Sequence, residues 1–72
     1  MKTTFDEIRQ RLHEAGCDTP CTAVNDDGEN IIIVAGKDEA GEYYQIITSQ
    51  SNGWLRVNTY YKSGDQTESY KR

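Results

Sequence analysis

Three side chains near the end of the first predicted helix are of types that bind metals or act as nucleophiles. His13, Cys17 and Cys21 recur at intervals of four residues, a spacing that would suit a zinc site if a further ligand such as Asp18 joined them. Structural zinc sites normally take four Cys or His ligands, and these three are the only Cys and His residues in the chain. A Cys–His nucleophile would also need an orienting residue and an oxyanion site. We therefore expect no metal site and no catalytic dyad, but half-buried thiols and a surface imidazole.

Carboxylates are abundant, but each group of them lies where the backbone gives a sufficient reason for it. Acidic residues cluster at positions 6–7, 26–29 and 38–39, which are a predicted helix start and two predicted turns, where acids are favoured. Residues 26–30 resemble a calcium loop but lack its twelve-residue spacing and its terminal Glu. The six glycines are dispersed rather than gathered in a phosphate-binding loop. The sequence thus predicts no catalytic residues, no cofactor and no enzyme.

Aromatic and cationic side chains in the second half of the chain give the clearest signal of a binding surface. Tyr43, Trp54, Arg56 and Tyr60 are of the types enriched in protein interfaces and in platforms that bind single-stranded nucleic acid. They are the residues for which we predict contact with a partner. The alternative is that aromatic residues occur here because they favour strands, and that they only shield the outer surface of a sheet.

The charge of the chain bears on the kind of partner. Twelve Asp and Glu against eight Lys and Arg give a formal net charge of −4, which repels nucleic-acid phosphates and mildly favours a partner with a basic surface. Acidic groups at residues 26–29 and 38–42 fall at opposite ends of the predicted second strand. They suggest a further alternative, an acidic mimic that occupies a basic nucleic-acid-binding groove, although such mimics usually carry a denser acidic array.

The elements that must position these side chains begin with an N-terminal helix. Thr4, with Glu7 three residues later, predicts a capping box, in which each side chain satisfies a backbone donor at the helix start. An apolar stripe then recurs on one face at helical spacing, and it consists of Phe5, Ile8, Leu12 and Ala15. Gly16 is placed to take the left-handed conformation that ends a helix. The spacing predicts a helix over residues 4–15.

Turn signals divide the rest of the chain into strands. Glycine-containing turns near residues 27–28, 37–41, 52–53 and 63–64 separate segments that read as strands over residues 20–26, 29–36, 42–51, 54–62 and 65–70. This order predicts a single small α+β domain over residues 1–72, with the helix packed on an antiparallel meander of four or five strands. The run of apolar residues 31–34 predicts a strand that is buried on both faces, in the centre of the sheet or under the helix.

The turn at Asn52-Gly53 decides which side chains share a face of the sheet. If it is a two-residue turn, Ser49 lies opposite Arg56, and Tyr43, Trp54, Arg56 and Tyr60 lie together. The other face then collects a more aliphatic set, Tyr44, Ile46, Thr48, Leu55, Val57, Thr59 and Tyr61. We expect the helix to cover the aliphatic set and to leave the aromatic and cationic set open to a partner. A slip of one residue would exchange the two faces.

These observations predict a non-enzymatic protein–protein interaction module, such as a small inhibitor, adaptor or regulatory protein, that uses an open sheet face or an edge strand. The alternatives are single-stranded nucleic-acid binding, the acidic mimic, and, more remotely, an enzyme or metal protein. Homo-oligomers through a sheet edge are possible. A chain of 72 residues has little room for an enclosed ligand pocket of about 300 Å³. With no apolar run of about 18 residues and no apolar signal core in residues 1–7, we expect no membrane partner, a cytoplasmic location and reduced thiols.

Overall fold

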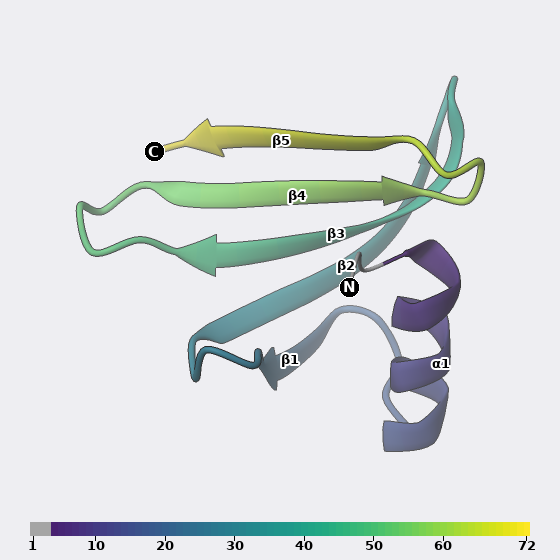
Figure 1. Ribbon diagram of the computed structural model, residues 1–72, viewed down its shortest axis with the longest axis horizontal. Helices are drawn as coiled ribbons and strands as arrows, with labels where there is room; N and C mark the ends of the chain where they lie inside the picture. Colours follow the sequence, from purple (N-terminus) through teal and green to yellow (C-terminus); the bar gives the residue numbers. More distant parts are fainter. Residues whose placement is uncertain (1–3) are drawn as a thin grey trace.

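The computed structural model describes residues 4–72, which form an N-terminal helix and an antiparallel sheet (Figure 1). The elements are α1 (Phe5–Ala15), β1 (Cys21–Val24), β2 (Asn30–Asp38), β3 (Gly41–Ser49), β4 (Leu55–Tyr61) and β5 (Gln66–Lys71). The strand order in the sheet is the order in the chain, β1-β2-β3-β4-β5, so the predicted α+β meander is confirmed. The prediction for residues 1–7 includes positions 1–3, which lie outside the described residues. No helix within residues 4–72 is long and apolar enough to cross a membrane.

Both ends of α1 are fixed by the residues that predicted them. The Thr4 hydroxyl oxygen accepts a hydrogen bond from the Glu7 backbone N–H at 3.3 Å, which satisfies one of the free donors of the first turn. Gly16 takes the left-handed conformation, with φ of 65°, and its N–H donates to the His13 carbonyl at 3.1 Å. The predicted helix over residues 4–15 is therefore confirmed, with Thr4 as its N-cap.

The core lies between α1 and β2. Ile8 and Leu12 pack against Ile31 and Ile33, and all four side chains are buried. The Phe5 ring is also buried and lies 4.6 Å from the Tyr44 ring of β3, measured between ring centroids. Three residues of the apolar stripe thus dock as predicted, whereas Ala15 is exposed, and β2 lies under the helix.

The prediction that β2 is buried on both faces is wrong. Its neighbour β3 occupies the middle of the sheet, and the side chain between the two buried isoleucines, Ile32, is 47% exposed. A strand buries both faces only when layers cover both sides of its sheet. Within the described residues α1 covers one side, so only alternate residues of β2 enter the core.

Three of the four hairpins share one loop geometry. In each, a three-residue loop joins two paired residues. The backbone N–H of the first residue donates to the carbonyl oxygen of the second, at 3.0, 2.8 and 2.9 Å. The pairs are Asn25 with Glu29, Gln50 with Trp54, and Tyr61 with Asp65. The last loop residue is always a glycine with positive φ, as in a type I turn followed by a left-handed residue.

The predicted two-residue turn at Asn52-Gly53 is therefore wrong. Such a turn needs positive φ at both positions, and among residues 4–72 only glycines have positive φ. The loop gains Ser51, and the pairing of β3 with β4 shifts by one residue: Arg56 lies opposite Thr48, and Tyr60 lies opposite Tyr44.

This shift leaves the faces of β3 as predicted and exchanges those of β4. Arg56 and Tyr60 lie on the side of the sheet that carries α1. The predicted helix-side residues of β4 lie on the other side, namely Leu55, Val57, Thr59 and Tyr61. Tyr43 lies on that other side as well, so the four predicted partner residues do not share a face.

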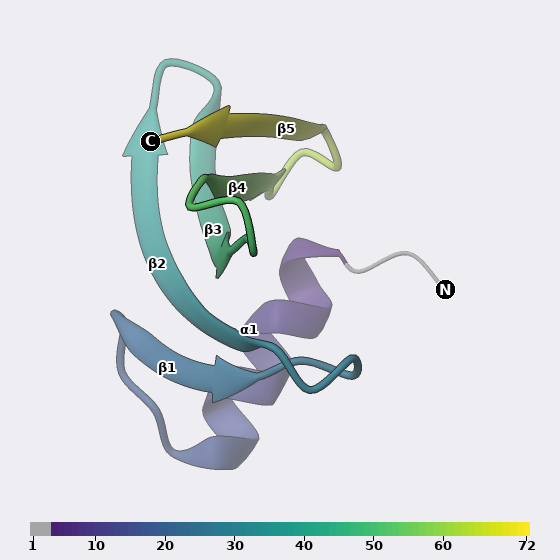
Figure 2. The same ribbon diagram turned by 90° about the vertical axis from the view of Figure 1, so that its left-hand side faces the viewer.

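The helix covers only one end of its side of the sheet. Its buried residues pack against β2 and against partly buried residues of β1 and β3, whereas every residue of β5 is exposed. Figures 1 and 2 show α1 beside β1 and β2, with β5 at the far edge. The helix-side surface of the β4–β5 hairpin therefore remains accessible.

Candidate functional site

A hollow of about 310 Å³ lies on the helix side of the sheet, between α1, the β1–β2 loop and β4. Its apolar lining consists mainly of Ile8, Leu12, Ile31, Ile33 and Ile46. Arg56, Asn58 and Tyr60 of β4 supply polar groups on one side, and residues 25–27 supply them on the other. This volume is at the lower end of the range for ligand pockets. The hollow is open rather than enclosed, so it is not the enclosed pocket that the length of the chain disfavours.

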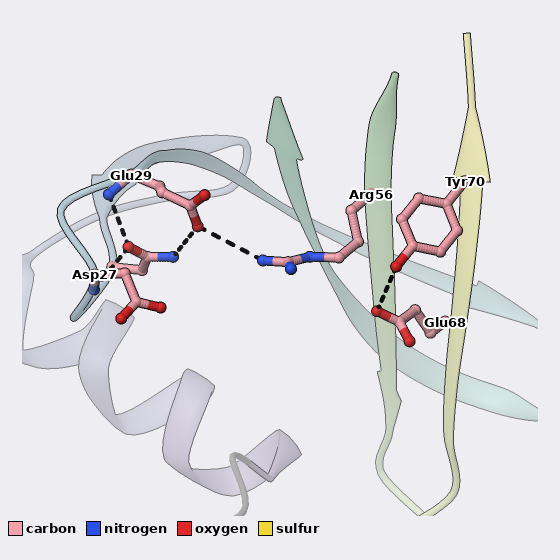
Figure 3. Close-up of polar contacts among 6 residues, drawn as sticks. Asp27, Glu29, Arg56, Glu68 and Tyr70 are labelled. Carbon is pink, nitrogen blue, oxygen red and sulfur yellow. Dashed lines mark hydrogen bonds and ion pairs between the residues drawn. The ribbon is translucent and has the colours of Figure 1, made fainter. Parts of the chain in front are cut away.

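Arg56 reaches from β4 toward the β1–β2 loop, where its Nη2 atom lies 3.6 Å from Oε2 of Glu29 (Figure 3). The Arg56 side chain is 30% exposed, but its Nε atom is buried and has no hydrogen-bond partner within the described residues. A buried donor left unpaired costs about 1–3 kcal/mol. This donor is unpaired but buried, so another molecule can meet only the exposed part of the Arg56 side chain.

Glu29 is held in place by Asn25. The Asn25 side-chain amide donates to Glu29 Oε2 at 3.0 Å, and its Oδ1 atom accepts the backbone N–H of Glu29 at 2.8 Å and that of Asp27 at 3.0 Å. A partly exposed ion pair contributes little to stability. Its effect here is to orient Arg56, because the carboxylate that faces the guanidinium is itself fixed by the loop.

The β4–β5 hairpin extends this surface beyond the helix. Pairing places Tyr70 opposite Arg56 and Glu68 opposite Asn58, and the Tyr70 hydroxyl donates to Glu68 Oε1 at 3.2 Å (Figure 3). Tyr70 is 54% exposed. At the same end of the hairpin, the Arg72 guanidinium lies 5.0 Å from the centroid of the Trp54 ring. We call the hollow and the hairpin surface beside it the Arg56 groove, with Trp54, Arg56, Tyr60, Glu68 and Tyr70 as its hairpin side.

Tyr60 connects the hairpin side to the core. It packs against the core cluster, and burial raises the pKa of its phenol, an effect that the Arg56 charge opposes and the Glu68 charge reinforces. The phenol is therefore neutral near pH 7, where it can both donate and accept a hydrogen bond.

Three of the four predicted partner residues, Trp54, Arg56 and Tyr60, lie on the same side of the β4–β5 hairpin. Tyr43 is separated from them: its ring lies on the other face, next to Gly36 and edge-on to the Tyr61 ring at 5.7 Å. The sequence reading missed Glu29, Glu68 and Tyr70. The Ser63-Gly64 turn carried the signal for Tyr70, because a three-residue loop there places it opposite Arg56.

The two thiols lie beside the hollow but not as a reactive pair. Cys17 and Cys21 are free and half-buried. A hydrogen bond to Cys17 and, to a smaller extent, burial raise the pKa of Cys21, which favours the thiol over the nucleophilic thiolate. His13 is exposed, and within residues 4–72 no three His, Cys, Asp or Glu side chains are grouped to hold a metal ion.

No protein-family model, no curated protein and no solved structure matches this chain. What the groove can do follows from its own groups. An oriented, partly exposed guanidinium, an apolar lining and an exposed tyrosine ring are suited to recognising another molecule. The carboxylates of Glu29 and Glu68 set the sign of charge that surrounds the guanidinium.

Proposed function

We propose that this chain is a non-enzymatic protein-interaction module, in the class of small inhibitors, adaptors and regulatory proteins, and that its partner binds in the Arg56 groove. The observation that carries the proposal is that Arg56, Tyr60 and Tyr70 share the helix side of the β4–β5 hairpin, where Tyr70 is 54% exposed. Trp54 continues this side beyond β4 by the alternation of the strand. Trp, Tyr and Arg are the residue types that dominate binding energy at protein interfaces.

The hollow gives a partner side chain a place to anchor. Burying one aliphatic or aromatic side chain against its lining contributes about 1.5–3 kcal/mol. An acceptor beside that anchor would pair with the accessible part of the Arg56 guanidinium, whose side chain is 30% exposed. Because Glu29 already orients the guanidinium, little side-chain freedom is lost on binding.

Charge distinguishes a protein partner from single-stranded nucleic acid. The stacked Trp54 and Arg72 side chains and the nearby tyrosines would suit base stacking. However, Glu29 and Glu68 lie beside Arg56, and residues 26–27 add two carboxylates at the hollow. These charges repel phosphates and favour a partner that carries basic groups.

The acidic-mimic alternative is less favoured because its second acidic group is partly engaged within the chain. At the far end of β2 the Asp38 carboxylate accepts the Tyr61 hydroxyl at 2.9 Å, and Glu42 pairs with Lys62 at 3.3 Å. The remaining carboxylates form no continuous array, which a basic groove would require.

The test replaces Trp54 or Arg56 by Ala. Tagged parent protein captures its partner from native lysate, the partner is purified, and affinities are measured by calorimetry. We expect each variant to bind at least about 30-fold more weakly, since interface hot spots contribute about 2 kcal/mol or more. Thermal midpoints should stay near that of the parent, because the helix does not cover this surface.

Lys37→Ala is the matched control for Arg56→Ala, because it removes one positive charge from an exposed position on the same side of the sheet. It should bind as the parent does. Parental affinity in both groove variants would refute the proposal. Salt-sensitive binding of the parent to oligothymidylate, lost in Trp54→Ala, would instead support the nucleic-acid alternative.

A further inference from the structure

The side of the sheet away from α1, which we call the open face, is nearly free of charge. Charged residues make up 28% of the chain, yet among the strand residues that the register places on this face only Asp38 and Lys71 are charged. They lie at opposite ends of the strands, on β2 and β5. The open face is thus electrically neutral, while the whole chain carries a net charge of −4.

The centre of the open face is filled by a row of side chains that crosses all five strands. The row consists of Thr22, Ile32, Ile47, Val57 and Ser69. Val57 is only 2% exposed, although α1 lies on the other side of the sheet. Toward β1 the cover is incomplete, since Ile32 is 47% and Val24 is 64% exposed. Exposed aliphatic groups of this kind, on a surface depleted of charge, are typical of the centre of an interface.

We propose that a second copy of this chain packs on the open face, so that two sheets form a β-sandwich with the two helices outside. Face-to-face packing is a standard way for a sheet to bury its second apolar face. A two-fold arrangement brings the same surface together on both copies, and a neutral face meets no net like charge on its copy. A strongly basic partner, which the charge of the whole chain would attract, finds no net charge to recognise there.

The area of the open face sets the expected strength of this dimer. Five strands about 4.8 Å apart, with about seven residues each at about 3.3 Å per residue, span roughly 550 Å². Two copies would bury roughly 1,100 Å², just above the lower limit for a specific interface and below the usual 1,600 Å² or so. The dimer is therefore weak and depends on concentration. The Arg56 groove stays accessible on the outer side of each copy, so this proposal and the proposed function stand or fall separately.

Sedimentation equilibrium between about 5 and 500 µM tests the dimer in the concentration range where a small interface associates. The weight-average mass of the parent should rise from 8.2 kDa toward twice that value. Ile32→Glu brings like charges into the interface and should raise the dimer dissociation constant at least about tenfold. Ala35→Glu is the matched control, because it adds the same charge to an exposed position on the opposite face of the same strand, and it should associate as the parent does.

Circular dichroism and thermal midpoints establish that each variant is folded. If Ile32→Glu is unfolded, Val24→Glu replaces it, since that side chain is the more exposed of the two. A parent that remains monomeric at the highest concentration overturns the proposal. So does a folded open-face variant that associates as strongly as Ala35→Glu, because the copies would then meet through another surface, such as the β5 edge.

Discussion

The ring of Tyr43 occupies the space that a side chain at position 36 would need. Gly36 of β2 and Tyr43 of β3 are directly paired, and a Cβ atom on Gly36 would overlap the outer atoms of the tyrosine ring. An aromatic ring that covers a glycine in the neighbouring strand restores packing that the glycine lacks. The two residues therefore form one unit, and this packing is sufficient to explain a tyrosine at position 43.

Substitution of Gly36 by alanine should change the free energy of unfolding in opposite directions in two backgrounds. In the parent, Gly36→Ala displaces the ring and should lower the free energy of unfolding by about 1–3 kcal/mol, as overpacking does. In a Tyr43→Ala background the same change should raise it by about 0.5–1 kcal/mol, because alanine is favoured over glycine within a strand. Urea unfolding of the four proteins measures the coupling. Equal effects in both backgrounds would show that the ring does not cover Gly36.

Tyr61 links stability to alkaline pH. Its hydroxyl donates to Asp38 Oδ2 at 2.9 Å, and this hydrogen bond, with smaller effects of burial and nearby charge, raises the pKa of the phenol. Burial raises the pKa of Tyr60 in the same direction. A group whose pKa is higher in the folded chain stabilises it fully below the unfolded value of about 10, and this stability is lost as pH rises through the folded value.

The contribution of these two phenols to the thermal midpoint should therefore be level just below pH 10 and fall above it. Tyr61→Phe removes one of the two phenols and should make the alkaline fall shallower, while Tyr60→Phe reports the contribution of the other. Differential scanning calorimetry from about pH 8 to 11.5 covers the relevant range. Parallel profiles for the parent and Tyr61→Phe would mean that the hydrogen bond to Asp38 does not couple stability to pH.

At the scale of elements, α1 is attached through a short apolar stripe. Leu12→Ala should lower the free energy of unfolding by about 2–5 kcal/mol, the range for removing a buried aliphatic side chain, because Leu12 is buried against Ile31 and Ile33. Domains of this size have only about 4–11 kcal/mol in total. Urea unfolding measures the loss, with His13→Ala as the control at the exposed neighbouring position. Equal losses in the two variants would show that the helix does not dock by this stripe.

The hairpin loops mark the limit of what the sequence could predict about elements. Glycine at the end of each loop was a correct turn signal, since Gly28, Gly53 and Gly64 all take positive φ. The same dipeptides did not encode the length of the loop, because a two-residue loop and a three-residue loop can both end in such a glycine. In the longer loop Asn52 keeps negative φ and its Oδ1 atom accepts the Trp54 N–H at 3.0 Å. That local hydrogen bond favours the observed form.

At the scale of the molecule, residues related along one strand could be predicted to lie together, whereas residues related across a hairpin could not. Trp54, Arg56 and Tyr60 belong to one segment at even spacing, so alternation along a strand relates them whatever the register. Tyr43 is related to them only across a hairpin, and one extra loop residue moved it to the opposite face. The helix stripe predicted docking, but it held no information on which end of the sheet the helix covers. Accessibility of the β4–β5 surface could therefore be learned only from the structure.

The order of strands in the sheet has a consequence for the time in which the chain folds. Each strand pairs with its neighbour in the chain, and the β2–β3 connection has only two residues between paired positions. Every ladder can therefore form by closing a short loop, which has a small entropic cost. Contacts of low sequence separation are associated with rapid folding, whereas the packing of Phe5 on Tyr44 joins distant parts of the chain. The sheet should therefore assemble within milliseconds, unusually fast for a mostly β protein, with helix docking as the slower event.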